Sequence, residues 1–145
     1  MLLVVGIVAL FRGIVATATW DVIIKTCDVP GAGTDASVYL KIYYVYANSD
    51  ETFLLDHESR NDFERGARDH FKIVVNSSDI VSLGLFWWPS LSLNQNWCVD
   101  WLTLMSSSDE LCIVARFDKW ILHYKDPPTY PVNFTKMRYA DCVQP

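Results

Sequence analysis

Apolar and polar residues alternate with a period of two along most of the chain after Trp20. Successive side chains of a β-strand point to opposite faces, so this alternation predicts strands with one buried and one solvated face. Four segments alternate clearly: residues 20–26, 38–43, 53–55 and 70–75. Two later segments, 97–104 and 111–122, favour strand through their aromatic and β-branched content. The pattern therefore predicts a series of short strands.

Turn-forming residues separate these segments. Clusters of Gly, Pro, Asn, Asp and Ser occur at residues 30–33, 48–50, 76–79, 94–96 and 106–109. Many short strands at near-regular spacing indicate an all-β protein built as an antiparallel sandwich or barrel. No long amphipathic helix is predicted, and a short helical turn fits residues 60–67.

The first eighteen residues follow a different pattern. They are almost wholly apolar, with Arg12 as the one charged residue, and they end in Ala-Thr-Ala at residues 16–18. This small-x-small ending is typical of a secretory signal peptide, so we expect cleavage after Ala18. The alternative is a buried N-terminal strand or helix. A permanent membrane anchor is disfavoured because the run is short and Arg12 would be costly within a bilayer.

The rest of the chain fits one domain and a tail. Residues 19–125 are expected to form a single β-domain, a size that suits one hydrophobic core. Residues 126–145 contain four prolines and are predicted to form an irregular Pro-rich tail held in place by Cys142. With residues 1–18 as a signal peptide, the predicted location is the secretory pathway, either secreted or in the lumen of the endoplasmic reticulum.

Charge limits the kinds of partner. The formal net charge is −5, and no run of Lys or Arg occurs along the chain. A nucleic-acid partner is therefore disfavoured, because proteins that bind nucleic acids usually show a basic stripe. An acidic balance still allows membrane contact, although it argues against attraction to anionic lipid by bulk charge alone.

The four cysteines form an even set downstream of the predicted cleavage point. In an oxidising compartment they predict two disulfides, and the absence of a CxxC pair disfavours a zinc site. We expect Cys98–Cys112, across the turn at residues 106–109, and Cys27–Cys142, which would hold the tail against the loop end of the domain. Spacing alone leaves all three pairings open.

In a secreted protein, two short triplets become candidate sites of modification. Residues 76–78 read Asn-Ser-Ser and residues 133–135 read Asn-Phe-Thr, and both match the acceptor motif for N-linked glycosylation. Asn76 and Asn133 are therefore candidate glycosylation sites.

Two longer motifs carry a family resemblance. Residues 30–36 read Pro-Gly-Ala-Gly-Thr-Asp-Ala, and residues 63–71 read Phe-Glu-Arg-Gly-Ala-Arg-Asp-His-Phe. Further along come Leu83-Gly84, then Trp97 at the start of a strand, then Trp120-Ile121. Together they resemble the PLAT/LH2 domain, which accompanies lipoxygenases, lipases, polycystins and bacterial phospholipase toxins. The resemblance implies a β-sandwich of two packed antiparallel sheets.

A stand-alone secreted copy is most similar to the single-domain secreted PLAT proteins of plants, which are linked to stress responses. Some PLAT domains bind calcium at the end of the sandwich where these two motifs would meet. The resemblance therefore implies a calcium site built from Asp28, Asp35, Glu64 and Asp69, since oxygen ligands on loops suit this ion. The alternative is that the aspartates brace the loops by accepting backbone N–H bonds.

Residues 86–89 read Phe-Trp-Trp-Pro, the most unusual aromatic cluster in the chain. If the segment is extended, neighbouring side chains face opposite sides, and the pattern places Trp87 inside and Trp88 outside. An exposed tryptophan suits a membrane interface or a protein contact. We take Phe86, Trp87 and Trp88 as candidate contact residues; the alternative is an aromatic group covered by a loop.

Signatures of catalysis are missing. The chain has no GxSxG, HExxH or P-loop motif, and its three histidines are isolated in sequence. We therefore expect a non-catalytic monomer that binds lipid surfaces or lipid-associated proteins, with calcium as a candidate cofactor. The alternative is a stress-response module that binds a protein partner without any lipid role.

Overall fold

The computed structural model describes residues 18–46, 49–88, 96–121 and 128–145, and it is all-β as expected. Its strands, in chain order, are β1 (Ala18–Thr26), β2 (Ser37–Tyr44), β3 (Asp50–Leu55), β4 (Arg68–Val75), β5 (Ile80–Trp88), β6 (Trp97–Ser106), β7 (Leu111–Ile121) and β8 (Asn133–Arg138). A 3₁₀ turn, η1 (Tyr139–Asp141), follows β8.

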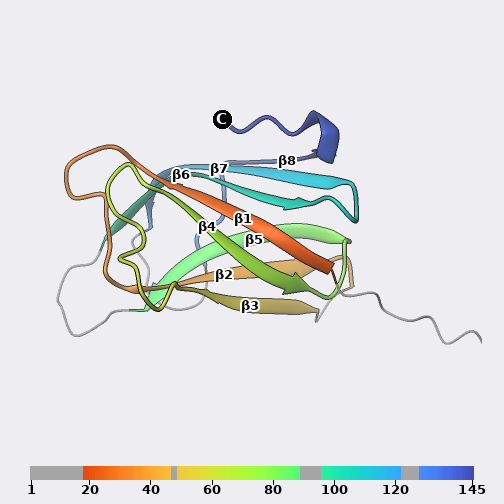
Figure 1. Ribbon diagram of the computed structural model, residues 1–145, viewed down its shortest axis with the longest axis horizontal. Helices are drawn as coiled ribbons and strands as arrows, with labels where there is room; N and C mark the ends of the chain where they lie inside the picture. Colours follow the sequence, from red (N-terminus) through yellow and green to blue (C-terminus); the bar gives the residue numbers. More distant parts are fainter. Residues whose placement is uncertain (1–17, 47–48, 89–95, 122–127) are drawn as a thin grey trace, which may run out of the picture.

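The strands form two antiparallel sheets packed face to face (Figure 1). One sheet has five strands in the order β4-β1-β6-β7-β8, and the other has three in the order β3-β2-β5. The two-sheet sandwich is therefore confirmed. Alternate residues of each strand face the space between the sheets, as Val22 and Ile24 of β1 and Leu40 and Ile42 of β2 illustrate, and these four side chains are fully buried.

Strand β8 corrects the prediction of an irregular tail. Its residues pair with β7 in continuous antiparallel register from Leu111↔Arg138 to Arg116↔Asn133. Phe134 is the one residue of this strand that packs against the core. The strand therefore has no regular alternation of buried and exposed residues. An edge strand with so little burial leaves almost no periodic signal.

No helix forms at residues 60–67, so the helical turn expected there is also wrong. Phe63 has a φ of 60° and Gly66 a φ of 72°, both in the left-handed region. An α-helix requires φ near −63°, so the backbone cannot continue a helical turn through either residue.

The disulfide pairing also differs from the expected one. Cys27 bonds Cys98 and Cys112 bonds Cys142, with Cα–Cα distances of 5.4 and 5.8 Å. In the β6–β7 hairpin Cys98 lies opposite Trp120, and Cys112 lies opposite Met105. The two cysteines therefore sit at opposite ends of the hairpin and cannot be joined. Cys142 does tie down the tail, but to β7.

Residues 1–17 lie outside the described residues, so the signal peptide stays a prediction, and Ala18 pairs with Val75 at the start of β1. Within the described ranges, no helix has the length and apolar character needed to cross a membrane.

Candidate functional site

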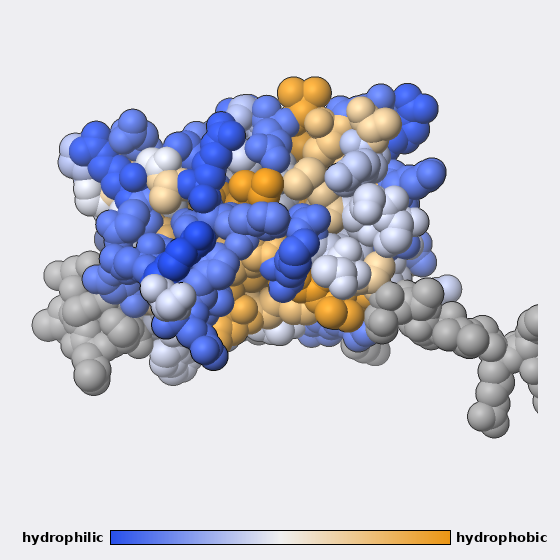
Figure 2. All heavy atoms as spheres, in the orientation of Figure 1, coloured by the Kyte–Doolittle hydropathy of each residue, from blue (hydrophilic) through white to orange (hydrophobic). Residues whose placement is uncertain are grey.

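The loops that carry the two family-like motifs meet at one end of the sandwich. Residues 27–36 connect β1 to β2, and residues 56–67 connect β3 to β4. Both lie at the left in Figure 1, where β5 and β7 end and β6 begins. We call this region the loop end and the opposite end of the sandwich the far end. The view in Figure 2 is largely hydrophilic over the loops on the left, and its hydrophobic residues gather nearer the middle.

Close backbone contacts lock the two loops together. The Thr34 N–H donates to the Phe63 carbonyl over 3.1 Å, and the Cys98 N–H donates to the Ala32 carbonyl over 3.1 Å. A side chain at Gly33 would place its Cβ 3.1 Å from the same Phe63 oxygen, so this close approach favours glycine. The Cys27–Cys98 disulfide adds a covalent link between the first loop and β6.

Asp69 braces the second loop from below. It is buried, and its Oδ2 accepts the Phe63 N–H over 2.9 Å, which holds Phe63 in its left-handed conformation. Arg60 Nη2 lies 3.8 Å from the other carboxylate oxygen. Burial raises the pKa of the Asp69 carboxyl above its ordinary value, and the hydrogen bond from the Phe63 N–H partly offsets this rise.

A second buried carboxylate, Asp62, was not singled out from the sequence. Its two oxygens accept the backbone N–H and the ring Nδ1 of His57, each over 2.7 Å. The His57 ring stacks on Phe71 with centroids 4.4 Å apart. Asp62 and His57 therefore stabilise the conformation of the loop at residues 56–67.

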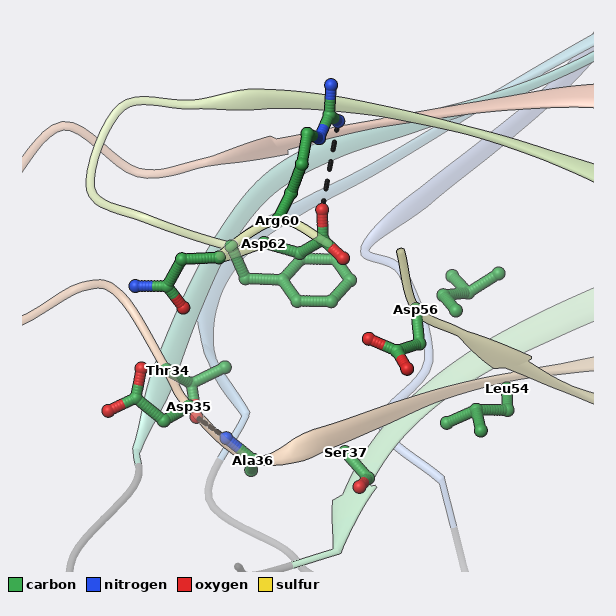
Figure 3. A pocket seen from close by; sticks show the side chains of 11 residues that line it. Thr34, Asp35, Ala36, Ser37, Leu54, Asp56, Arg60 and Asp62 are labelled. Carbon is green, nitrogen blue, oxygen red and sulfur yellow. Dashed lines mark hydrogen bonds and ion pairs between the residues drawn. The ribbon is translucent and has the colours of Figure 1, made fainter. Parts of the chain in front are cut away.

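Between the loops lies a cleft of about 140 Å³. Its lining includes Asp35, Ser37, Leu54, Asp56 and Asn61. Figure 3 shows the Asp56 carboxylate directed toward the middle of the cleft, whereas Asp35 lies at the rim with its carboxylate turned outward. The cleft is thus polar, with two exposed carboxylates on different loops.

The four carboxylates of the predicted calcium site do not converge. Asp28 forms an ion pair with Arg65 over 2.9 Å, and Glu64 accepts a hydrogen bond from Asn61. Asp69 is occupied beneath the loop, which is the bracing role weighed as the alternative. Across the described part of the chain, no group of three or more His, Cys, Asp or Glu side chains is arranged to hold a metal ion. Among the carboxylates that line the cleft, Asp56 is directed toward its middle, and it was missed because it follows β3, outside both motifs.

The aromatic segment follows the predicted parity. Trp88 is 48% exposed, whereas Trp87 is 6% exposed and its Nε1 donates to the Ile121 carbonyl over 2.7 Å. Trp87 is therefore a core residue, and its assignment as a contact residue is corrected. Phe86 is half-buried on the outer face, where it stacks on Tyr39 with centroids 5.0 Å apart.

Trp88 lies beside the cleft. In the β2–β5 register it pairs with Ser37, which lines the cleft wall. Among the described residues of the loop end, Val29, Leu54 and Trp120 also have exposed apolar side chains. Trp120 belongs to this end because it pairs with Cys98 at the start of β6. The loop end therefore combines a polar cleft with a rim of exposed apolar groups, which we call the apolar rim (Val29, Leu54, Trp88, Trp120).

Replacing Asp69 by Asn should separate two effects of this side chain on stability: its hydrogen bond with the Phe63 N–H and its buried negative charge. A carboxyl group whose pKa is higher in the folded than in the unfolded protein stabilises the fold when it is protonated. This contribution to the unfolding free energy is complete below the unfolded-state pKa and is lost as pH rises through the folded-state pKa. Asp69→Asn keeps the acceptor for Phe63 and removes the cost of burying a charge. We expect it to match or exceed wild type in stability at neutral pH and to flatten the fall in stability as pH rises.

The matched variant Asp69→Ala leaves the Phe63 N–H unpaired, so we expect it to lose about 1–3 kcal/mol of unfolding free energy. Denaturant unfolding across about pH 4 to pH 7 gives the comparison. Equal destabilisation by both variants would show that the negative charge itself holds the loop.

The fold and the loop end define a β-sandwich module whose irregular loops gather at one end. The model of the PLAT/LH2 domain family matches residues 20–134, and the chain belongs to this family. Lipoxygenase homology domain-containing protein 1 of Homo sapiens is 31% identical over 137 residues, covering 87% of this chain and 6% of that protein. The Mus musculus protein of the same name gives the same figures. The chain thus spans only 6% of the length of these curated relatives.

Solved structures share the fold. A coral 8R-lipoxygenase, described in terms of calcium activation via a C2-like domain, superposes with a TM-score of 0.64 and 24% identity, over 72% of this chain and 16% of that chain. The alpha toxin from Clostridium absonum gives 0.60 and 22%, over 83% and 31%. These relatives do not show the expected closeness to secreted plant proteins.

Proposed function

We propose that the chain is a non-catalytic module of the secretory pathway that binds lipid surfaces through its loop end. The observation that carries this proposal is Trp88, a half-exposed tryptophan beside a polar cleft. Tryptophan suits the membrane interface because its ring is largely apolar while its N–H remains near water. The coral lipoxygenase and the clostridial toxin are similar in fold, and in both the matched region forms only a part of the chain, 16% and 31%.

The apolar rim supports reversible rather than permanent attachment. Burying the exposed part of one tryptophan contributes on the order of 2 kcal/mol, at about 25 cal/mol for each Å² of apolar surface. Leu54 and Trp120 add smaller areas at the same end. The sum suits a domain that leaves a membrane readily and needs a second contribution for tight binding.

Calcium is a candidate for that second contribution. Its site would differ from the predicted one and would consist of Asp35 and Asp56. The ion takes six to eight oxygen ligands, so Asp35 and Asp56 would hold it only with further oxygens from water or lipid phosphate. Asp35 is exposed and lies at the rim, so its side chain can turn at little cost. Binding would then require calcium and lipid together, because the third acidic residue of the cleft, Asp62, is buried and both of its oxygens are bound to His57.

A protein partner is the second candidate function, and the outer face of the three-stranded sheet favours it. Tyr39 and Phe86 stack there, and Tyr130 donates a hydrogen bond to the Tyr43 hydroxyl over 3.2 Å. Such an aromatic surface suits a lipid-associated protein or a partner in a stress response. This surface adjoins Trp88, because Phe86 lies two residues before it on the same face of β5, so vesicle binding by wild type is what distinguishes the two functions.

Co-sedimentation with vesicles of mixed neutral and anionic phospholipid tests the proposal. We expect Trp88→Ala to weaken binding by about tenfold or more with or without calcium, given the loss of on the order of 2 kcal/mol. Asp35→Ala and Asp56→Ala should each remove only the calcium-dependent part. Tyr46→Ala is the matched control, since Tyr46 is 76% exposed at the far end, and it should bind like wild type.

Two outcomes would contradict the proposal. If wild type stays in the supernatant with every lipid mixture, with calcium and with chelator, lipid binding fails and the protein-partner function replaces it. If Tyr46→Ala weakens binding as much as Trp88→Ala, the loop end is not the contact surface. Thermal unfolding of each variant establishes that binding differences do not come from misfolding.

A further inference from the structure

Both glycosylation triplets lie at exposed strand ends, one at the far end of the sandwich and one beside the middle of β7. Asn76 follows directly after β4, and Asn133 is the first residue of β8. Both side chains are exposed. Their positions in the sandwich decide which surfaces an attached glycan would cover.

Asn76 marks the far end. The preceding residue, Val75, pairs with Ala18, the first residue of β1, and β1 runs from there toward the loop end. The ends of β4 and the start of β1 lie together at the right in Figure 1, opposite the loops. A glycan on Asn76 would therefore extend from the surface farthest from Trp88.

Asn133 lies on the outer face of the five-stranded sheet. It pairs with Arg116, whose side chain is exposed, while the next residue, Phe134, turns inward and packs on the core. Side chains alternate along a strand, so Asn133 and Thr135 point outward together. Arg116 stands near the middle of β7, so a glycan here would cover the edge and outer face of this sheet, the face of Trp120, whereas Trp88 belongs to the other sheet.

The contacts of both asparagines are compatible with a linked sugar. An N-glycosidic bond replaces one of the two hydrogens on Nδ2 and leaves the other hydrogen and the carbonyl oxygen unchanged. Asn76 Nδ2 donates to Glu51 Oε1 and can still do so through the remaining hydrogen. Thr135 Oγ1 donates to Asn133 Oδ1 over 3.2 Å, and this acceptor is not consumed.

We propose that Asn76 and Asn133 carry N-linked glycans that leave bare the part of the loop end around Trp88, so that the glycosylated domain meets a lipid surface through this part. In each transfer Nδ2 bonds to the first sugar carbon of a lipid-pyrophosphate-linked oligosaccharide. The bond from that carbon to the pyrophosphate breaks, the pyrophosphate leaves with the electron pair, and the amide releases one proton. The second half of this inference rests on the lipid-binding function proposed above.

Two disulfides support passage through the compartment where this transfer occurs. All four cysteines are paired, and such bonds persist in oxidising compartments such as the endoplasmic reticulum. The disulfides are independent of the triplets, so two unrelated features of the chain point to the same compartment.

Position 35 offers a sharp test of glycan placement. A single substitution, Asp35→Asn, turns residues 35–37 into Asn-Ala-Ser and so creates an acceptor triplet at the rim of the cleft. Secretion from animal cells then gives a domain with a third glycan beside Trp88. A peptide amidase that removes N-glycans converts each linked asparagine to aspartate, which restores the natural Asp35.

The experiment uses the full chain secreted from animal cells. Peptide mapping after amidase treatment should find Asn76 and Asn133 converted to aspartate in wild type; two unmodified asparagines would overturn the modification. In vesicle flotation, glycosylated wild type and the Asn76→Gln/Asn133→Gln variant should bind equally. Purified Asp35→Asn carrying its third glycan should lose binding, and amidase treatment should restore it to the level of treated wild type.

The remaining outcomes separate this inference from the proposed function. If Asn76 and Asn133 are occupied but wild type never floats with vesicles, the lipid-binding function fails and only the glycan sites stand. If wild type floats and removing its two natural glycans raises binding strongly, those glycans obstruct the contact surface and the placement is wrong. Undiminished binding of the triply glycosylated variant would equally overturn the loop end as the uncovered surface.

Discussion

Replacing both Cys27 and Cys98 with alanine should lower the unfolding free energy by about 4 kcal/mol. The bond closes a loop of 71 residues, and a long closed loop restricts the unfolded chain strongly. It also anchors residues 27–36 to β6, so the same variant should lose part of its vesicle binding. Denaturant unfolding and co-sedimentation of one preparation measure both effects.

The second disulfide is the control for the first. Cys112→Ala with Cys142→Ala opens a loop of only 30 residues and releases the tail rather than the loop end. We expect a somewhat smaller loss of stability, about 3–4 kcal/mol, and unchanged vesicle binding. If both double variants lose binding to the same degree, the effect comes from general destabilisation and not from the geometry of the loop end.

Trp97→Ala should cost about 3–5 kcal/mol of unfolding free energy, as truncation of a large buried aromatic typically does. Trp97 is fully buried, its Nε1 donates to Thr26 Oγ1 over 3.1 Å, and its ring meets the Phe63 ring edge-on at 5.0 Å. It therefore supports the second loop from within the core. Removing it leaves a cavity beneath Phe63 and an unpaired Thr26 hydroxyl.

Trp120→Ala provides the matched comparison for this prediction. Trp120 lies at the same end of the sandwich and is 39% exposed, so its truncation should change stability by less than about 1 kcal/mol. Thermal and denaturant unfolding of the two variants gives the difference directly. Similar losses for Trp97 and Trp120 would contradict the assignment of one to the core and the other to the apolar rim.

Alternation predicted β1, β2, β3 and β4, residue content predicted β6 and β7, and β5 was not among the predicted strands. The parity argument also placed Trp87 and Trp88 correctly, because residues 80–88 form one extended strand in which successive side chains face opposite sides. Strand β8 was not predicted because Phe134 is its single contact with the core. The strand signal in a sequence therefore reflects burial more than backbone pairing.

The cysteine pairing and the roles of the carboxylates could not be derived from the sequence. Both depend on which strands and loops come together in the folded protein. Cys98 and Cys112 are close in the chain, but the antiparallel pairing of β6 with β7 sends them to opposite ends. The role of Asp69 depends on the unusual backbone of Phe63, which a sequence pattern does not reveal. Asp56 acquires its place in the cleft only when two loops distant in sequence meet.

Backbone hydrogen exchange with and without vesicles tests most directly whether the loop end meets lipid, and it requires no mutation. A bound surface excludes water from the amides it covers, so we expect slower exchange in residues 27–36, in residues 56–67 and at the end of β5. Exchange in the far-end turns, residues 44–46 and 75–80, should not change. Protection of the far end, or no protection anywhere while the protein sediments with vesicles, would contradict the account.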